Sequence, residues 1–451
     1  MSSLPLSPTR KQVLKFIFES SRYGNLGTFI GAGFSKAVLN HRKKIALSWG
    51  ELLEKAAEKL SVNYDSFPKV GYGFPELASL ICRKYADSSG KSYDDSLLQL
   101  KVEIAALTSW YPDQECRDEY ASYLETLSPA WIITTNYDLI IESLLLGKSI
   151  PLEPKDPLSS PSSVIPVYHL HGVRTNPESI IIAQEDYISL FRPNEYRQIK
   201  LALTIKESVT LLLGYGLGDV NVLTALDWSK NVFTHARENY PNDIIQVIKS
   251  DSPGDKPYRD AHGVIIIETS DLAEFFAEYS EISIKESKKK EREKENLKKL
   301  SDTLTHPGSD TIARFIDEEI FRKDILAKLS KFSIDLISGF ISFLDKCIDQ
   351  TWERSRPSCA FGGYNQNLNI ILDILCAFPL CNFPPALLQT VVQSLERVAP
   401  LIGKEKGQSW EADSTWKKRR GELPPELVEE LKNIAEQHSY DRVYSLICST
   451  P

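Results

Sequence analysis

The chain has 451 residues, more than the roughly 250 to 300 that one hydrophobic core usually serves, so we expect two domains. A hydrophobic fraction of 42% and a charged fraction of 25% are typical of a globular protein with a sizeable core. The formal net charge of −8 argues against a protein that binds nucleic acid along its whole length.

The seven cysteines are odd in number and scattered, which favours reduced thiols over a disulfide framework. The first residues lack the apolar core of a secretory signal, and no apolar run approaches the roughly 20 residues of a membrane span. These features predict a cytoplasmic protein with no membrane partner.

The first predicted elements are a helix at residues 8–23 and a strand at residues 26–30. The strand is an apolar run typical of a parallel strand buried on both faces, and it ends abruptly in two glycines that allow a tight turn. The backbone N–H groups of such a turn can face an anion at the start of the next helix. The candidate pyrophosphate-binding residues of this turn are Gly31, Ala32, Gly33, Phe34 and Ser35.

Two familiar fingerprints are missing from this turn. Lys36 stands where the pattern GxGxxG requires its third glycine, and the pattern GxxxxGK[ST] does not occur in the chain. The two glycines are therefore also compatible with a plain turn that lets a helix pack closely on a strand.

A second candidate site follows a mostly helical stretch, residues 74–127, which comes after a helix that begins with the capping box Ser48 to Glu51. A strand at residues 131–135 gives way to a helix at residues 139–146. Between them lie Asn136 and Asp138, at the carboxyl edge of the sheet, where open α/β folds bind ligands. A turn followed by a helix N-cap is the alternative interpretation of this pair.

Two more strand ends complete the predicted site. A Pro/Ser-rich loop at residues 151–163 precedes a strand at residues 164–170, which ends in His171 and a glycine. The fourth strand, residues 209–213, runs into the glycine-rich segment that holds Gly214, Gly216 and Asp219. His171 is the candidate general base, with a hydrogen-bonded structural histidine as the alternative, and we assign His169 a structural role. Strands at residues 244–249 and 264–268 and a helix from residue 270 close the predicted parallel sheet.

The ordered motifs GAGFS, TTNYD, HG and GYGLGD resemble the signatures of sirtuin-like NAD-consuming domains over roughly residues 10–280. The similarity is closer to the bacterial branch that acts in anti-phage defence, which hydrolyses NAD, than to the protein deacylases. Deacylating sirtuins carry a zinc module with two CxxC pairs, whereas no cysteine lies between His171 and Gly214. The resemblance therefore implies NAD as substrate and no metal. Gly216 stands where the family commonly has a serine.

The activity implied by the resemblance is that of an NAD glycohydrolase, with Asn136 binding the nicotinamide ribose or the attacking water and His171 acting as base. Asp138 either steadies the cationic ribose or caps the next helix. Gly214, Gly216 and Asp219 are expected on the adenosine side. Two alternatives stay open: an NAD-dependent protein deacylase, and a non-catalytic sensor of NAD or ADP-ribose.

Three regions are expected along the chain: a Rossmann-like catalytic domain at residues 1–280, a charged connecting helix at 281–304 and an all-α domain at 305–451. The last region contains helical stretches at residues 311–347, 368–378, 385–401 and 424–448 and a loop at residues 352–367. We expect it to act as a sensor, partner-binding or oligomerisation module. The resemblance implies a homo-oligomer controlled by a phage-derived trigger or a protein partner, of which a partner ATPase is one possibility, and no direct contact with nucleic acid.

Overall fold

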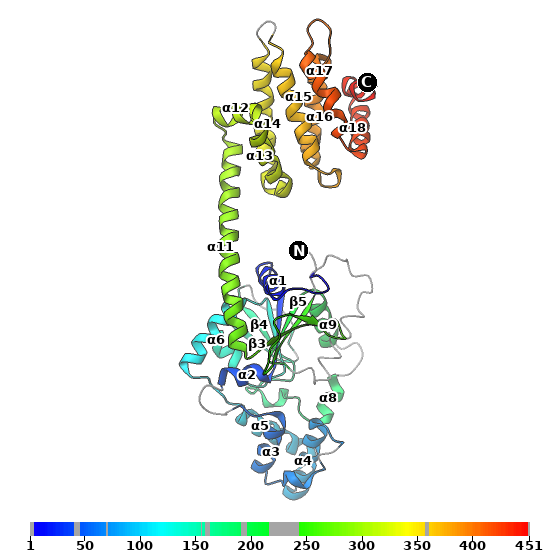
Figure 1. Ribbon diagram of the computed structural model, residues 1–451. Helices are drawn as coiled ribbons and strands as arrows, with labels where there is room; N and C mark the ends of the chain where they lie inside the picture. Colours follow the sequence, from blue (N-terminus) through cyan, green and yellow to red (C-terminus); the bar gives the residue numbers. More distant parts are fainter. Residues whose placement is uncertain are drawn as a thin grey trace. The chain divides into compact units, whose positions relative to one another are not determined.

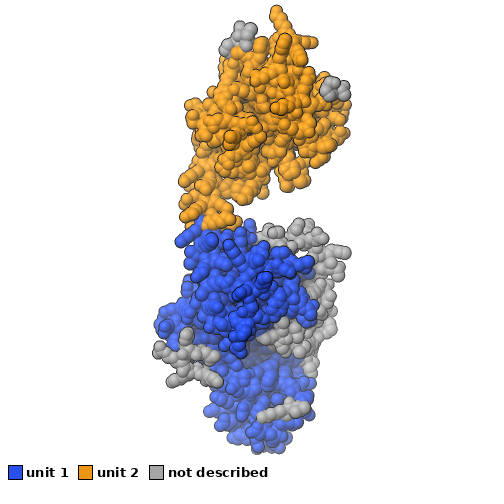
Figure 2. All heavy atoms as spheres, viewed as in Figure 1, with its two compact units in different colours: residues 1–288 blue, residues 289–451 orange. Residues whose placement is uncertain are grey.

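The protein was analysed as a computed structural model, which describes residues 4–39, 46–68, 71–154, 156–157, 163–190, 196–215, 243–356 and 360–449. The chain divides into two compact units, residues 1–288 and residues 289–451. Figure 2 draws these units in different colours. Each unit has hydrophobic clusters of its own.

The first unit combines a β-sheet with helices on both of its faces (Figure 1). Its strands are β1 (Leu26–Ile30), β2 (Trp131–Thr134), β3 (Ser149–Leu152), β4 (Ile165–His169), β5 (Val209–Leu213), β6 (Ile244–Lys249), β7 (Tyr258–Arg259) and β8 (Ile265–Thr269). Its helices are α1 (Arg10–Arg22), α2 (Ala32–Leu39), α3 (Trp49–Lys59), α4 (Phe74–Ser89), α5 (Tyr93–Leu107), α6 (Gln114–Leu127), α7 (Ile140–Leu144), α8 (Gln184–Leu190), α9 (Tyr196–Lys206) and the first part of α11 (Leu272–Thr305).

The eight described strands follow the order β3-β4-β2-β1-β5-β6-β8-β7. Their pairings are parallel except for that of β7 with β8. The central strand β1 pairs with β2 and β5, with Ile30 opposite both Thr134 and Leu213. The carboxyl ends of β4, β2, β1 and β5 therefore lie next to one another on one edge of the sheet.

Successive side chains along each strand point to opposite faces of the sheet. Helices cover both faces. Leu26 and Ile30 belong to a hydrophobic cluster that includes residues of α1, α6 and α11. Phe29 points to the opposite face and joins a cluster with Leu201 and Ile205 of α9. A third cluster holds helices α3, α4 and α5 together as a helical group beside the sheet, as Figure 1 shows.

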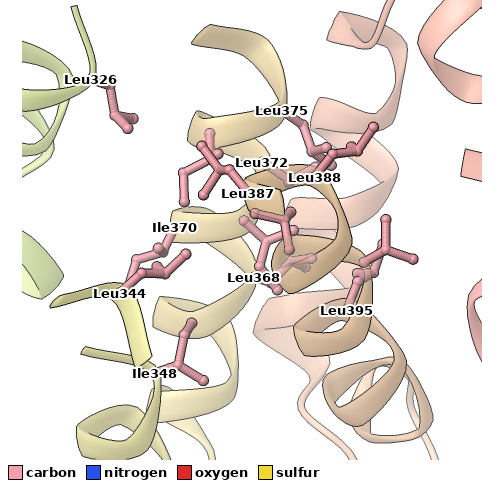
Figure 3. Packing of buried hydrophobic residues seen from close by; sticks show 14 of the residues in the cluster. Leu326, Leu344, Ile348, Leu368, Ile370, Leu372, Leu375, Leu387, Leu388 and Leu395 are labelled. Atoms are coloured by element: carbon pink, nitrogen blue, oxygen red, sulfur yellow. The ribbon is translucent and has the colours of Figure 1, made fainter. Parts of the chain in front are cut away.

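The second unit is all-helical in its described residues. Beyond the end of α11 its helices are α12 (Ser309–Asp317), α13 (Glu319–Lys331), α14 (Ser333–Arg354), α15 (Gly362–Ala377), α16 (Pro385–Val398), α17 (Trp410–Arg419), α18 (Pro425–His438) and α19 (Asp441–Cys448). Figure 3 shows how leucine and isoleucine side chains of α14, α15 and α16 pack in its core. No described helix of the protein is both long and apolar enough to cross a membrane.

A buried ion network ties three helices of this second unit together. The Asp373 carboxylate of α15 lies 2.6 Å from Arg322 Nε of α13 and 2.7 Å from Arg419 Nη2 of α17. The side chains of Asp373 and Arg322 are only 1% and 5% exposed. Arg322 also donates to the carbonyl oxygens of Phe315 and Ile316 at the end of α12. The buried charges of Asp373 and Arg322 therefore have charged or hydrogen-bonding partners, which offset the free-energy cost of removing them from water.

The predicted fold class is confirmed: a mostly parallel sheet flanked by helices is followed by an all-helical region. Several finer predictions are wrong. The loop expected from residue 151 begins inside β3, and the loop expected at 352–367 is shortened by α14 and α15. The helical stretch expected at 311–347 is helical and is divided among α12, α13 and α14. Strand β7 and helix α17 were not predicted. The domain limits at residues 280 and 304 stay predictions, and α11 extends across both positions.

Candidate functional site

The four neighbouring strand ends open into one cavity of about 560 Å³, a size within the range of small-molecule sites. The end of each strand contributes to its lining, as a parallel sheet with this strand order requires. The lining residues from these ends are Ala32 and Gly33 after β1, Thr135, Asn136, Tyr137 and Asp138 after β2, His171 after β4, and Gly214 and Tyr215 after β5.

The glycine turn after β1 packs tightly against the turn after β5. The Gly31 N–H donates to the Leu213 carbonyl at 3.0 Å, and the Gly33 N–H donates to the Gly214 carbonyl at 2.8 Å. A Cβ atom on Gly33 would lie 2.7 Å from the Gly214 carbonyl oxygen. Close backbone approach therefore explains these glycines directly, and the two N–H groups predicted to bind pyrophosphate already have protein acceptors.

Phe34 and Ser35 occupy buried positions in α2. The Phe34 ring packs edge-on against Tyr120 with the ring centroids 5.7 Å apart, within the core beside the sheet. The Phe34 N–H donates to the Gly31 carbonyl at 3.0 Å, so the cofactor contact predicted for Phe34 has no support from its side chain. Ser35, which is 1% exposed, takes part in a side-chain network instead.

Ser35 joins Asn136 to Asp138. Asn136 Nδ2 donates to Ser35 Oγ at 2.9 Å, and Ser35 Oγ lies 3.0 Å from Asp138 Oδ2. A hydroxyl has only one proton to donate, and a carboxylate accepts it, so Ser35 must accept from the amide of Asn136. This direction turns the amide nitrogen of Asn136 toward Ser35 and places its amide oxygen on the other side, as an acceptor.

Asp138 is almost completely buried at the start of α7. Its carboxylate accepts the Ile140 N–H at 3.1 Å as well as the Ser35 hydroxyl. Burial raises the pKa of Asp138 to about 6, against the opposing effect of these hydrogen bonds. The structure therefore gives Asp138 the helix-capping contact and also places it on the cavity wall.

His169 lies behind the cavity at the end of β4 and is fully buried. Its Nδ1 atom is 2.9 Å from the Asn136 carbonyl oxygen, and its Nε2 atom is 2.8 Å from Glu142 Oε1 of α7. Burial lowers the pKa of His169, but the hydrogen bond and the charge of Glu142 outweigh burial and raise the pKa above its ordinary value.

His171 is 2% exposed and lines the same cavity as Asn136. Its ring meets Tyr187 of α8 edge-on, with ring centroids 5.4 Å apart. Its carbonyl oxygen accepts the Ile181 N–H at 2.8 Å. Gly172 follows with a φ angle of +88°, and a Cβ atom there would meet the Ser179 carbonyl at 2.2 Å. The turn that holds His171 therefore requires glycine at position 172.

Further lining residues of the cavity come from helices that the sequence did not single out. Helix α3 contributes Trp49, α4 contributes Phe74, and Trp110 follows α5. Lys36 is the one lysine or arginine among the described lining residues. An aromatic-rich helical stretch was visible in the sequence, but nothing local indicated that its rings would face the strand ends.

Two predicted residues, Gly216 and Asp219, lie outside the described residues. Of the remaining candidates, Asn136, Asp138 and His171 share the cavity, together with Ala32, Gly33 and Gly214. Within the described ranges no group of three or more His, Cys, Asp or Glu side chains is placed to hold a metal ion.

Comparison with known proteins points to one family. Residues 130–267 match the family model of the SIR2-like domain. Over 227 residues the chain is 25% identical to Defense-associated sirtuin 2 from Bacillus subtilis, in an alignment that covers 49% of this chain and 21% of the relative. The chain thus spans about a fifth of that relative's length. The matched range contains Asn136, Asp138 and His171, whereas Ser35 and Lys36 precede it.

Proposed function

We propose, from the match of residues 130–267 to the SIR2-like domain model, that the α/β unit is an NAD glycohydrolase that releases nicotinamide and ADP-ribose. The observation that carries the proposal is that Asn136 and His171, from separate strand ends, line one cavity beside the buried Asp138. In this proposal the amide oxygen of Asn136, the imidazole of His171 and the carboxylate of Asp138 surround one ribose of NAD.

The reaction breaks the bond between nicotinamide and C1′ of the ribose. Nicotinamide leaves with the electron pair of that bond as a neutral molecule, so no general acid is needed. A water oxygen bonds to C1′, and His171 accepts the water proton, which then passes to solvent. The amide oxygen of Asn136 orients the water or a ribose hydroxyl. The Asp138 carboxylate stabilises positive charge that develops on the ribose.

The rest of the cavity suits a dinucleotide with an anionic pyrophosphate. Lys36 supplies positive charge on the wall formed by α2. The rings of Trp49, Phe74 and Trp110 supply apolar surface that can contact a base and exclude water. Because the N–H groups of Gly31 and Gly33 are already engaged, Lys36 takes a larger share of pyrophosphate binding in this proposal than the glycine turn.

The proposal is tested by measuring nicotinamide and ADP-ribose released from NAD by the purified full-length chain. Asn136→Ala and His171→Ala are each expected to lower the rate by about a hundred- to ten-thousand-fold, the usual contribution of a general base or its orienting group. His262→Ala, on an exposed residue of the same unit, is the matched control and should keep the wild-type rate.

Two results would redirect the proposal. Acetyl-ADP-ribose formed from NAD and an acetylated peptide would indicate a deacylase. Tight NAD binding by a wild-type chain that releases no nicotinamide, in the presence and absence of phage lysate, would indicate a sensor.

We further propose that the activity serves defence against phage by depleting cellular NAD, as the name of the Bacillus subtilis relative suggests. The helical unit is then the module that receives the trigger or assembles the chain into a homo-oligomer. Infected cells that express the wild-type chain should lose NAD and survive as a population better than cells with the His171→Ala variant. The mass of the purified chain in solution reports the oligomer.

A further inference from the structure

His169 makes two hydrogen bonds that connect β4 to the residue that follows β2. Nδ1 lies 2.9 Å from the main-chain carbonyl oxygen of Asn136, and Nε2 lies 2.8 Å from Glu142 Oε1. The His169 side chain is 0% exposed and that of Glu142 is 15% exposed. The imidazole is thus fixed at both nitrogens in a place that water does not reach.

The two partners determine where the protons are. A carbonyl oxygen can only accept, so Nδ1 of His169 must carry a proton. The contact between Nε2 and the Glu142 carboxylate also contains one proton, because two acceptors would repel at this distance. The hydrogen bond and the charge of Glu142 raise the pKa of His169, which favours the ring over the carboxylate as the holder of that proton.

We propose that the His169–Glu142 pair is a positioning device that holds the main chain of Asn136 so that its amide faces the substrate ribose together with His171. This inference rests on the proposed hydrolase function. In this proposal His169 contacts no substrate and acts only through Asn136. It binds the main-chain carbonyl of Asn136, whereas Ser35 binds the side-chain amide. The carbonyl of Asn136 is fixed by His169 and the amide by Ser35, at 2.9 Å each.

Close packing alone does not require two ionisable side chains, His169 and Glu142, at this buried position. A leucine would fill a buried position without the desolvation cost of a charged ring and a carboxylate. Among the described residues Glu142 Oε2 has no hydrogen-bond partner although it is buried, which adds to that cost. The ionisable groups that face His169 are Glu142 of α7 and Asp138 of the loop before it. Both are acidic, so they favour the charged ring.

A pair of amide substitutions separates positioning from space filling. The amide nitrogen of asparagine occupies about the place of Nδ1 in histidine, and that of glutamine about the place of Nε2. His169→Asn therefore keeps the donor to the Asn136 carbonyl, whereas His169→Gln keeps only a donor to Glu142. We expect kcat for nicotinamide release to fall about three-fold in His169→Asn and thirty-fold or more in His169→Gln, with the Kd for NAD within three-fold of wild type in both.

Nitrogen NMR of the full-length chain with labelled histidine tests the proton positions without substrate. One of the seven histidines should show a protonated Nδ1 throughout pH 6 to 8, and its signals should vanish in both His169 variants. Glu142→Gln should shift that ring toward the neutral form and lower kcat. His262→Gln is the control and should leave the wild-type kcat and these signals in place.

The outcomes separate the inference from the function it rests on. A wild-type His169 whose Nδ1 carries no proton, or equal kcat losses in the two amide variants with wild-type melting temperatures, would overturn the positioning role while the hydrolase proposal stands. A wild-type chain that releases no nicotinamide would count against the hydrolase alone. In that case the side-chain amide signal of Asn136 decides the inference, because it should move in His169→Gln and stay in His169→Asn.

Discussion

Ser35, Asn136 and Asp138 form a chain of short side chains in which each member fixes the next. The Asp138 carboxylate takes the single hydroxyl proton of Ser35, and Ser35 then has to accept from Asn136. A buried polar network of this kind is stable only while every member is satisfied. The protonation state of Asp138 therefore sets the orientation of the amide that faces the cavity.

Asp138→Asn should remove a pH dependence of folding stability that the buried carboxyl group gives to the wild-type protein. The pKa of Asp138 is raised to about 6, so between about pH 4 and pH 6 the folded chain keeps a proton that the unfolded chain has released. This contribution favours the folded state at low pH and is lost as pH rises past 6. The asparagine variant does not titrate, so the unfolding free energy of wild type relative to the variant should fall by about 1 kcal/mol or more between pH 5 and pH 8.

The measurement is urea unfolding of both proteins at pH 5 and pH 8. Asp118→Asn, on an exposed side chain, is the control and should change the unfolding free energy by less than about 0.5 kcal/mol at both values. Nicotinamide release should fall in Asp138→Asn, since a neutral amide stabilises a cationic ribose less than a carboxylate does. A difference in unfolding free energy that stays constant between pH 5 and pH 8 would contradict the role given to burial.

The sequence predicted that Asn136, Asp138 and His171 lie at one edge of the sheet, because each follows an apolar run that stops abruptly, and the three residues line one cavity. It did not locate the wall that faces them. Trp49 and Trp110 come from helical segments whose aromatic residues could equally have served the core, and only tertiary packing directs them into the cavity. Ser35 was expected to bind the cofactor, whereas the structure gives it two protein partners.

At the scale of elements, the strands with continuous apolar runs were predicted with the bounds that the structure has, as for β1, β5 and β6. β3 was missed because it lies at the sheet edge, pairs only with β4 among the described strands and contains Pro151, which a sequence pattern assigns to a loop. Helix α17 was missed because its sequence is mostly polar, and few of its side chains reach the core.

The contact between the turns after β1 and β5 predicts the effect of Gly33→Ala. The new Cβ atom would meet the Gly214 carbonyl oxygen at 2.7 Å, and Gly214, with a φ angle of +59°, has main-chain atoms that cannot move aside without strain. We expect a loss of about 1–3 kcal/mol in unfolding free energy, together with weaker NAD binding. Gly421→Ala, where a Cβ atom meets nothing within 4 Å, is the control. Unchanged stability in Gly33→Ala would contradict the tight packing of the two turns.

At the scale of the whole molecule, the two units have separate cores, since the cluster of the second unit shares no residue with those of the first. We therefore expect two thermal transitions in calorimetry of the full chain. Asp373→Ala leaves the buried Arg322 without its carboxylate and should lower the stability of the second unit by about 3–5 kcal/mol. Only the thermal transition of the second unit should shift to a lower temperature. A single transition for the full chain would show that the units unfold as one.

The cavity is assembled from two separate stretches of chain. The residues proposed to break the bond lie after position 130, within the range of the SIR2-like match, whereas Lys36, Trp49, Phe74 and Trp110 come from before it. In the proposed function, the earlier stretch supplies most of the surface that contacts the ligand, and the later stretch supplies the reacting groups. Substitutions at Trp49, Phe74 or Trp110 should therefore change ligand affinity more than the rate of bond cleavage.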